Sequence, residues 1–94
     1  MLELYLFTTK DCHSSAIMTD RVFDVVKDEF LERVRLRGKV VELNPRLCKE
    51  LGVTDAPTLY CVETKEKLIG VYSVAYIKSW IRSQIIGNGN NRIL

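Results

Sequence analysis

Short apolar runs alternate with longer stretches of helical spacing along this chain, which predicts a domain of the α/β class. Residues 2–7 are mostly apolar, as in a strand that is covered on both faces. The polar residues 8–11 then lead into a helix that should end near Gly38. The predicted buried side of this helix follows steps of three and four through Phe23, Val26, Phe30 and Val34.

The middle of the chain predicts a second strand and a short helix. Residues 39–44 include β-branched side chains and are expected to form the strand. Pro45 suits the first turn of a helix over residues 46–51, because the N–H groups of that turn have no partner within the helix and proline lacks an N–H. Gly52 suits its end, since glycine readily adopts the left-handed conformation that stops a helix.

The last third predicts an antiparallel hairpin and a closing helix. Residues 58–63 and 67–72 are separated by a short polar segment, a spacing that favours a hairpin. The closing helix is expected over residues 74–86. Its apolar positions are Val74, Ile77, Ile81 and Ile85, with Trp80 beside them. The predicted order is therefore β-α-β-α-β-β-α in one domain over residues 1–86, followed by a flexible tail at 87–94 that lacks apolar periodicity.

Composition and charge exclude several classes of function. Ninety-four residues with 47% hydrophobic composition can bury one core without a metal or disulfide staple. The net charge of +2 arises from mixed acidic and basic residues, with no basic run flanked by aromatic residues, so nucleic acid is not an expected partner. No basic leader precedes the first strand, and no segment approaches the roughly 18 apolar residues of a membrane helix. We therefore expect a soluble, cytoplasmic protein without a membrane partner.

The three cysteines are expected to play different parts. Their spacing matches neither a disulfide framework nor a paired zinc site, which favours a reducing compartment and predicts no metal site. Cys48 and Cys61 are predicted to be buried, Cys61 because it shares a strand face with Leu59. Cys12 has polar neighbours and begins a helix, where unpaired N–H groups and the positive end of the helix dipole stabilise a thiolate. Cys12 is therefore the candidate nucleophile.

The neighbours of Cys12 suggest further roles. His13 could assist thiolate formation as a cation or bind a metal, although a histidine on an exposed first turn is more often simply solvated. Ser15 stands where a dithiol redox motif carries its resolving cysteine, and its hydroxyl could cap the helix or donate a hydrogen bond to the thiolate. Lys10 and Asp11 carry opposite charges, so their effects on the pKa of the thiol should partly cancel.

Two segments carry a resemblance to a known family. The first strand leads into Cys12-His13-Ser14-Ser15 at a helix start, and a second strand and a short helix lead into Gly52-Val53-Thr54-Asp55-Ala56-Pro57-Thr58-Leu59. With the hairpin and closing helix, this order over residues 2–86 resembles the thioredoxin superfamily. It looks most like the small members of glutaredoxin size that carry a thioredoxin-like Pro-Thr. The resemblance implies a thioredoxin-like fold, in which a four-stranded mixed sheet has helices on both faces.

The resemblance also assigns roles to residues. Cys12 matches the nucleophile of the family, and Pro57 matches its cis-proline next to the active-site cysteine. Ala56, Pro57 and Thr58, together with His13, would then bind the substrate. The backbone of Ala56 would be free to pair with an extended substrate segment.

Three departures from the family pattern affect the expected chemistry. Ser15 replaces the second cysteine, so a mixed disulfide on Cys12 needs an outside thiol for its release. Leu6 stands where thioredoxins bury an aspartate, so no internal base is visible. Glutaredoxins hold glutathione with Thr-Val-Pro and Gly-Gly-Asp segments, whereas this chain has Asp55-Ala56-Pro57 and Gly70-Val71-Tyr72-Ser73.

Three functional hypotheses follow. The leading one is a monothiol thiol-disulfide oxidoreductase without a cofactor, in which Cys12 attacks a disulfide or mixed disulfide of a partner protein. Glutathione or another low-molecular-weight thiol would release the adduct. The alternative is a non-catalytic thioredoxin-fold module that binds a peptide between the Cys12 loop and Pro57. The third is a metal or iron-sulfur carrier in which Cys12 of two protomers ligates a cluster together with glutathione, as some monothiol glutaredoxins do. The loop of those proteins usually reads Cys-Gly-Phe-Ser, which His13 and Ser14 do not match.

Overall fold

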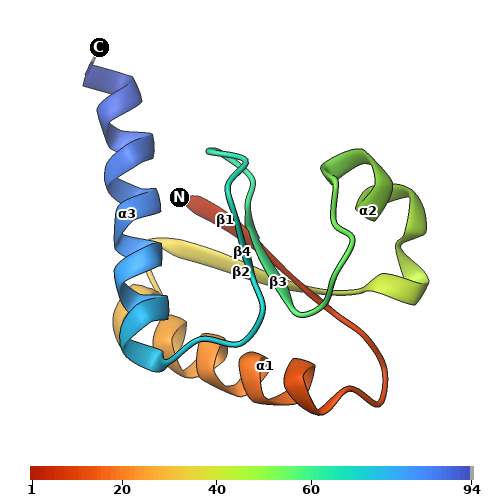
Figure 1. Cartoon of the computed structure of the whole chain (residues 1–94). Coiled ribbons are helices and arrows are strands. Elements are labelled where there is room, and N and C mark those ends of the chain that lie inside the picture. Colours follow the sequence, from red (N-terminus) through yellow and green to blue (C-terminus); the bar gives the residue numbers. More distant parts are fainter. Residues whose placement is uncertain (94) are drawn as a thin grey trace.

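The structure is a computed structural model that describes the backbone of residues 1–93 and the side chains of residues 1–88. Its centre is the strand β1 (Leu2–Thr8), which lies inside a four-stranded sheet of order β2-β1-β3-β4 (Figure 1). Strand β2 (Val34–Val40) pairs with β1 in parallel, and β3 (Thr58–Cys61) pairs with β1 antiparallel. Strand β4 (Lys67–Ile69) pairs antiparallel with β3 at the other edge. The predicted α/β class and mixed sheet are confirmed.

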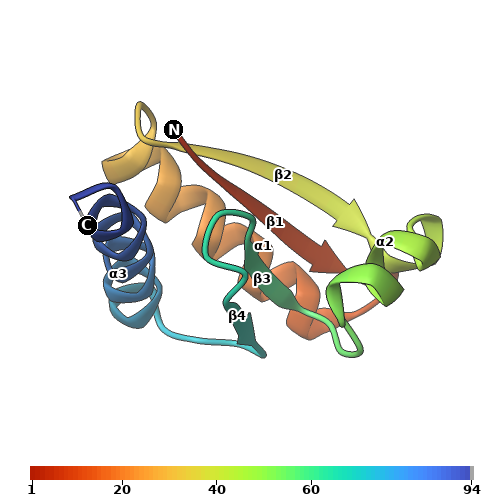
Figure 2. The same ribbon diagram turned by 90° about the horizontal axis from the view of Figure 1, so that it is seen from above.

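Helices cover both faces of this sheet because the side chains of β1 alternate between two cores. Leu4 and Leu6 pack with Met18 of α1 (His13–Val25) and Ile77 of α3 (Val74–Ile93). Phe7, from the opposite face, packs with the short helix α2 (Pro45–Leu51). Figures 1 and 2 show α2 apart from α1 and α3, at the end toward which β1 and β2 point. Burying each such leucine or phenylalanine stabilises the fold by about 1.5–3 kcal/mol.

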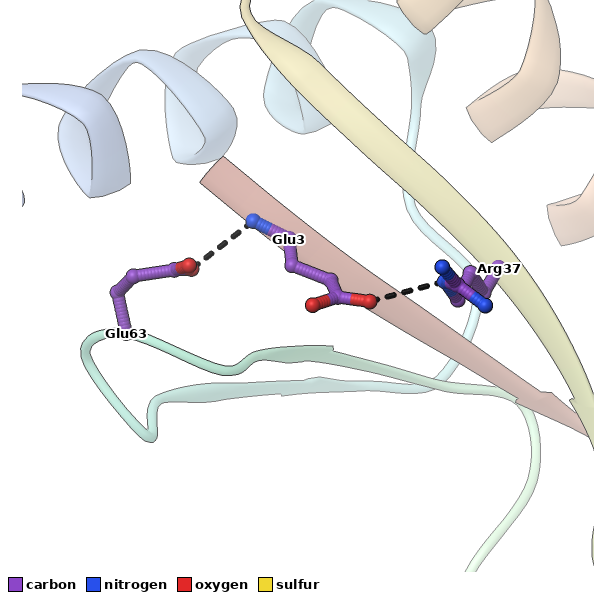
Figure 3. Close-up of polar contacts among 3 residues, drawn as sticks. All are labelled: Glu3, Arg37 and Glu63. Atoms are coloured by element: carbon purple, nitrogen blue, oxygen red, sulfur yellow. Dashed lines mark hydrogen bonds and ion pairs between the residues drawn. The ribbon is translucent and has the colours of Figure 1, made fainter. Parts of the chain in front are cut away.

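Polar contacts close the opposite end of the sheet. The Glu63 carboxylate accepts the backbone N–H of Glu3 at 2.9 Å, and the Glu3 carboxylate pairs with Arg37 Nε at 2.9 Å (Figure 3). These contacts join β1 to the β3–β4 turn and to β2. The candidate site lies at the other end of the sheet, where β1 finishes at Thr8.

The long helix and the second strand differ from their predicted positions. Helix α1 ends at Val25, a single π-helical segment spans Val26–Phe30, and β2 already begins at Val34, so the helix does not reach Gly38. Residues 39–44 are the end of β2 and a 3-10 turn, Val41–Leu43. Phe23, expected in the buried stripe, is 47% exposed. Val26, Phe30 and Val34 are buried as predicted, although they lie beyond the end of α1. Within α1 itself the buried residues are Ser15, Met18, Val22 and Val25.

The cause of this error is a segment with two competing periods. Val34 fits the helical spacing, but Val34 and Leu36 also alternate with Arg35 and Arg37, which is the period of a strand. Only a strand lets this segment pair with β1, from Leu2 opposite Val34 to Thr8 opposite Val40. Pairing along seven positions therefore overrides the local helical pattern.

The short helix and the hairpin are present, and the hairpin strands are shorter than predicted. Helix α2 starts at Pro45 and ends before Gly52, whose φ of 71° is left-handed. The strands of the hairpin span Thr58–Cys61 and Lys67–Ile69, within the predicted ranges 58–63 and 67–72. Gly70, with a φ of 105°, ends β4. Its N–H donates to the carbonyl of Pro57 at 2.8 Å, which ties the hairpin to the segment that precedes it.

The closing helix starts where the sequence predicts and continues further. Helix α3 runs from Val74 to Ile93, beyond the predicted end at residue 86. Ile77 and Ile81 are fully buried, whereas Val74 is 40% exposed. The backbone of the expected tail at 87–94 is thus helical as far as Ile93, while its side chains from residue 89 and Leu94 lie outside the described residues. The flexibility of this tail stays a prediction. Within residues 1–93, no helix is both long and apolar enough to span a membrane.

Candidate active site

Cys12 occupies the position directly before the first turn of α1. The chain leaves β1 at Thr8 and reverses through Asp11, whose φ of 55° is left-handed, a conformation that aspartate tolerates better than most residues. Cys12 is extended, with φ −105° and ψ 116°, and its carbonyl accepts the N–H of Ala16 at 3.1 Å. The sulfur therefore occupies the capping position at which a serine or aspartate oxygen usually meets the free N–H groups of a helix.

The surroundings of the sulfur favour its ionised form. The Ser15 hydroxyl makes the largest contribution, followed by the Ser15 N–H and the Thr9 hydroxyl, and together these donors lower the pKa of Cys12 to about 7. The smaller effect of burial acts in the opposite direction. The helix N-terminus has no side-chain capping hydrogen bond, so its donors remain available to the thiolate, a stronger acceptor than the thiol. About half of the Cys12 side chains are thus thiolate at neutral pH.

Ser15 holds the loop and the sulfur together. It is only 3% exposed, and its hydroxyl oxygen accepts the N–H of Thr9 at 3.3 Å. Its carbonyl accepts the Thr19 hydroxyl at 2.7 Å. Since the oxygen of Ser15 takes the Thr9 N–H, its single proton can be directed at the sulfur of Cys12. A hydroxyl in this position supports a thiolate but cannot attack a disulfide.

A cleft of about 670 Å³ opens beside the sulfur. The end of β1, the loop and the first turns of α1 line it, and they bring Cys12 and Ser15 together with the exposed His13 at its edge. Asp11 and Asp20 also line this cleft. Ligands of substantial size can therefore approach Cys12 from solvent.

The Pro57 segment reaches the same end of the sheet from another part of the chain. Thr58 pairs with Phe7, so Pro57 lies near the end of β1 from which the Cys12 loop departs. The Ala56–Pro57 peptide bond is cis. Within residues 1–93, the backbone N–H and C=O of Ala56 make no hydrogen bond, so they are free to pair with an added strand.

Buried contacts hold this segment in place on either side of Ala56. Pro57 and Thr58 are buried, and the Thr58 hydroxyl donates to the carbonyl of Asp55 at 2.7 Å. None of Ala56, Pro57 and Thr58 lines the cleft beside Cys12. The structure thus brings the two predicted segments to one end of the sheet, with the Pro57 segment outside the lining of the cleft beside Cys12.

The other two cysteines are buried, as predicted. Cys61 is fully buried on β3, and Cys48 is 5% exposed on α2. Burial raises the pKa of the Cys48 thiol, the reverse of the shift at Cys12. All three cysteines are free. Within the described part of the chain, His, Cys, Asp and Glu side chains form no cluster of three that could hold a metal ion.

Sequence reasoning missed two contributors to this site. Thr9 donates its hydroxyl toward the sulfur and its N–H to Ser15, and Asp20 lines the cleft one turn beyond Ala16. A threonine in the polar loop before a reactive cysteine is the signal that could have identified Thr9. The expected opposing effects of Lys10 and Asp11 are not part of the pKa shift, which comes from hydrogen-bond donors.

Comparison with known proteins identifies the fold. No family model and no curated protein matches this sequence. A structure of malaria parasite thioredoxin-2 matches with a TM-score of 0.74 at 17% identity, covering 88% of this chain and 82% of the other. Chloroplastic thioredoxin z matches with a TM-score of 0.75 at 20% identity, covering 93% and 80%. The chain has the thioredoxin-like fold.

A third likeness comes from work on redox proteins of yeast. A chain from a study of thiol resolution in yeast mitochondrial 1-Cys peroxiredoxin, through glutathione and thioredoxin systems, matches with a TM-score of 0.75 at 21% identity. The match covers 87% of this chain and 77% of the other. Within the thioredoxin-like fold of the present chain, Cys12 at the start of α1 and Pro57 before β3 lie at one end of the sheet.

Proposed function

We propose that this protein is a monothiol thiol-disulfide exchange protein of thioredoxin and glutaredoxin type, with Cys12 as its nucleophile. The observation that carries the proposal is the pKa of Cys12, which Ser15 and Thr9 lower to about 7 in an open cleft. A thiol with this pKa is about half ionised at neutral pH and remains a good nucleophile, because nucleophilicity falls as the pKa falls further.

The proposed reaction transfers one disulfide bond in three exchanges. The Cys12 thiolate attacks one sulfur of a partner disulfide, and the second partner sulfur leaves as a thiolate that takes up a proton. An outside thiolate then attacks the sulfur of Cys12, so that the partner departs fully reduced and Cys12 carries the outside group. A second outside thiolate removes that group and regenerates the Cys12 thiolate. The partner gains two protons and two electrons, and two outside thiols become one disulfide.

The Pro57 segment and His13 of the cleft would dock the partner protein. An extended partner segment would pair with the free backbone of Ala56, beside the buried Pro57 and Thr58, and the exposed His13 would contact it from the start of α1. This arrangement would place a partner disulfide near the sulfur of Cys12. The chemistry requires reduced thiols, so we propose a reducing compartment such as the cytoplasm.

A trapping experiment tests the proposal. The reduced protein is mixed with insulin at pH 7, and the adducts are followed by intact mass without added thiol. We expect a mixed disulfide confined to Cys12 that disappears when 2-mercaptoethanol is added. Cys12→Ser should give no adduct. An adduct on Cys48 or Cys61 at a comparable rate, or no adduct on any cysteine, would contradict the proposal.

The second candidate is a binding module that uses the same surface without thiol chemistry. The free N–H and C=O of Ala56 favour it, because strand addition needs no reactive sulfur. Partner binding that is equally tight in wild type and Cys12→Ala, without any thiol reactivity at neutral pH, would support this candidate over exchange.

A further inference from the structure

The cleft beside Cys12 carries more negative than positive charge. Asp11 and Asp20 both line it, and His13 is the only basic residue among its lining residues. Among the described residues, the side-chain ion pairs are Glu3 with Arg37 and Glu29 with Arg82, so neither aspartate is neutralised in this way. The two carboxylates therefore act on whatever enters the cleft.

Neighbouring cations of the described residues do not line this cleft. Arg21, next to Asp20, donates from Nη1 to the carbonyl of Tyr72 at 2.8 Å. Lys10 is exposed and is not a lining residue. Lys39 on β2 places its Nζ 5.2 Å from the centre of the Tyr5 ring, on the face of the sheet where α2 packs. The local charge thus opposes that of the whole chain, whose net charge is +2.

We propose that the outside thiol that releases Cys12 is an aminothiol, with a cationic ammonium group and no excess of carboxylates. The inference rests on the proposed exchange function and names the reductant of that same site. Glutathione carries two carboxylates against one ammonium, so the cleft disfavours it.

The charge of the thiol matters in both exchanges that involve it. The attacking sulfur is a thiolate in every case, so the aspartates repel that charge equally for all thiols. The remainder of the molecule differs: an ammonium group is attracted by Asp11 and Asp20, and a carboxylate is repelled. For charges on the order of 4–8 Å apart in a solvated cleft, attraction and repulsion by two carboxylates should make the rates of cationic and anionic thiols differ about tenfold at low ionic strength.

A release assay measures this preference directly. Cys12 is converted to its methyl disulfide with methyl methanethiosulfonate, and a single adduct is confirmed by intact mass. Release is then timed with cysteamine, 2-mercaptoethanol, 3-mercaptopropionate and glutathione, with each rate corrected for the thiolate fraction. In each exchange the incoming thiolate bonds to the methylthio sulfur, the old S–S bond breaks, and the Cys12 thiolate leaves. The same adduct unfolded in urea provides the intrinsic rate of each thiol.

For each thiol, the release rate from the folded protein is divided by its rate from the unfolded adduct. We expect this normalised rate to be about tenfold higher for cysteamine than for 3-mercaptopropionate, with 2-mercaptoethanol between them. Added salt at 0.5 M should remove most of this ratio, because the Debye length then falls to about 4 Å. Asp20→Asn should lower the ratio about threefold. Asp11→Asn should do the same without disturbing the loop, since asparagine also tolerates a positive φ.

A matched control separates the cleft from the overall charge. Asp24 is exposed on α1 and does not line the cleft, so Asp24→Asn removes one negative charge elsewhere and should leave the ratio near its wild-type value. Equal rates for cationic and anionic thiols, or an equal loss of preference in Asp24→Asn, would overturn the inference while leaving the exchange function intact. A Cys12 that takes up no methylthio group when folded would overturn the exchange function itself, and the inference with it.

Discussion

The same side chain has opposite character at two places in this molecule. At the end of β1, Cys12 lies at the start of α1 with Ser15 and Thr9 as hydrogen-bond donors, and its pKa falls to about 7. On α2, Cys48 is surrounded by apolar side chains, and burial raises its pKa. The comparison teaches that hydrogen-bond donors and access to water decide whether a cysteine is a nucleophile or a small apolar core residue.

The contrast should be largest in alkylation. We expect iodoacetamide at pH 7 to modify Cys12 at least about 1000-fold faster than Cys48 or Cys61, because the buried thiols react only after local opening of the fold. Peptide mapping after timed quenching measures all three rates in one sample. The three cysteines should react at similar rates in urea. Similar alkylation rates in the native protein as well would show that their environments do not differ as the structure indicates.

Ser15→Cys should give the next largest effect. A second sulfur one helical turn from Cys12 converts release of a mixed disulfide into an intramolecular step, and we expect the lifetime of the adduct to fall at least about 100-fold. Intact mass follows the lifetime, and insulin reduction under limiting dithiol follows the turnover. An unchanged lifetime would mean that the loop is not built for exchange, and the binding-module candidate would then lead.

Removing only the Ser15 hydroxyl should have a smaller effect on the same sulfur. Ser15→Ala should raise the pKa of Cys12, since the strongest donor to the thiolate is lost, and slow its alkylation at pH 6 about tenfold. The pH dependence of alkylation between pH 5 and 10 measures the pKa. Ser14→Ala is the matched control, because it alters an exposed neighbour whose contribution comes from the backbone. A similar rise in both variants would exclude a specific role for the Ser15 hydroxyl.

The smallest expected effect is on the pH dependence of stability. The folded pKa of Cys12, about 7, is below the value of about 8.5 for an unfolded cysteine. The ionised thiol therefore stabilises the folded state above pH 8.5, and this stabilisation is lost as the pH falls through 7. Urea midpoints at pH 6 and pH 9 should rise more with pH in wild type than in Cys12→Ser. Parallel pH profiles for the two proteins would contradict the lowered pKa.

Sequence patterns determined those parts of the molecule that local chemistry controls. The apolar run of residues 2–7 predicts β1, and Pro45 and Gly52 predict both ends of α2, because each residue restricts the backbone at its own position. The polar residues on either side of Cys12 distinguish it from the buried Cys48 and Cys61. These features depend on neighbours in the chain, so the sequence alone was sufficient.

Tertiary contacts decided the parts that depend on distant residues. Residues 34–40 fit a helix or a strand by pattern, and pairing with β1 selected the strand. The donation of the Thr9 N–H to Ser15 and the meeting of Asp11 and Asp20 in one cleft require the loop to fold back on α1. The approach of Pro57 to the end of β1 depends on the register between Thr58 and Phe7. Pairing and burial free energies arise only between elements already brought together, so no local pattern carries them.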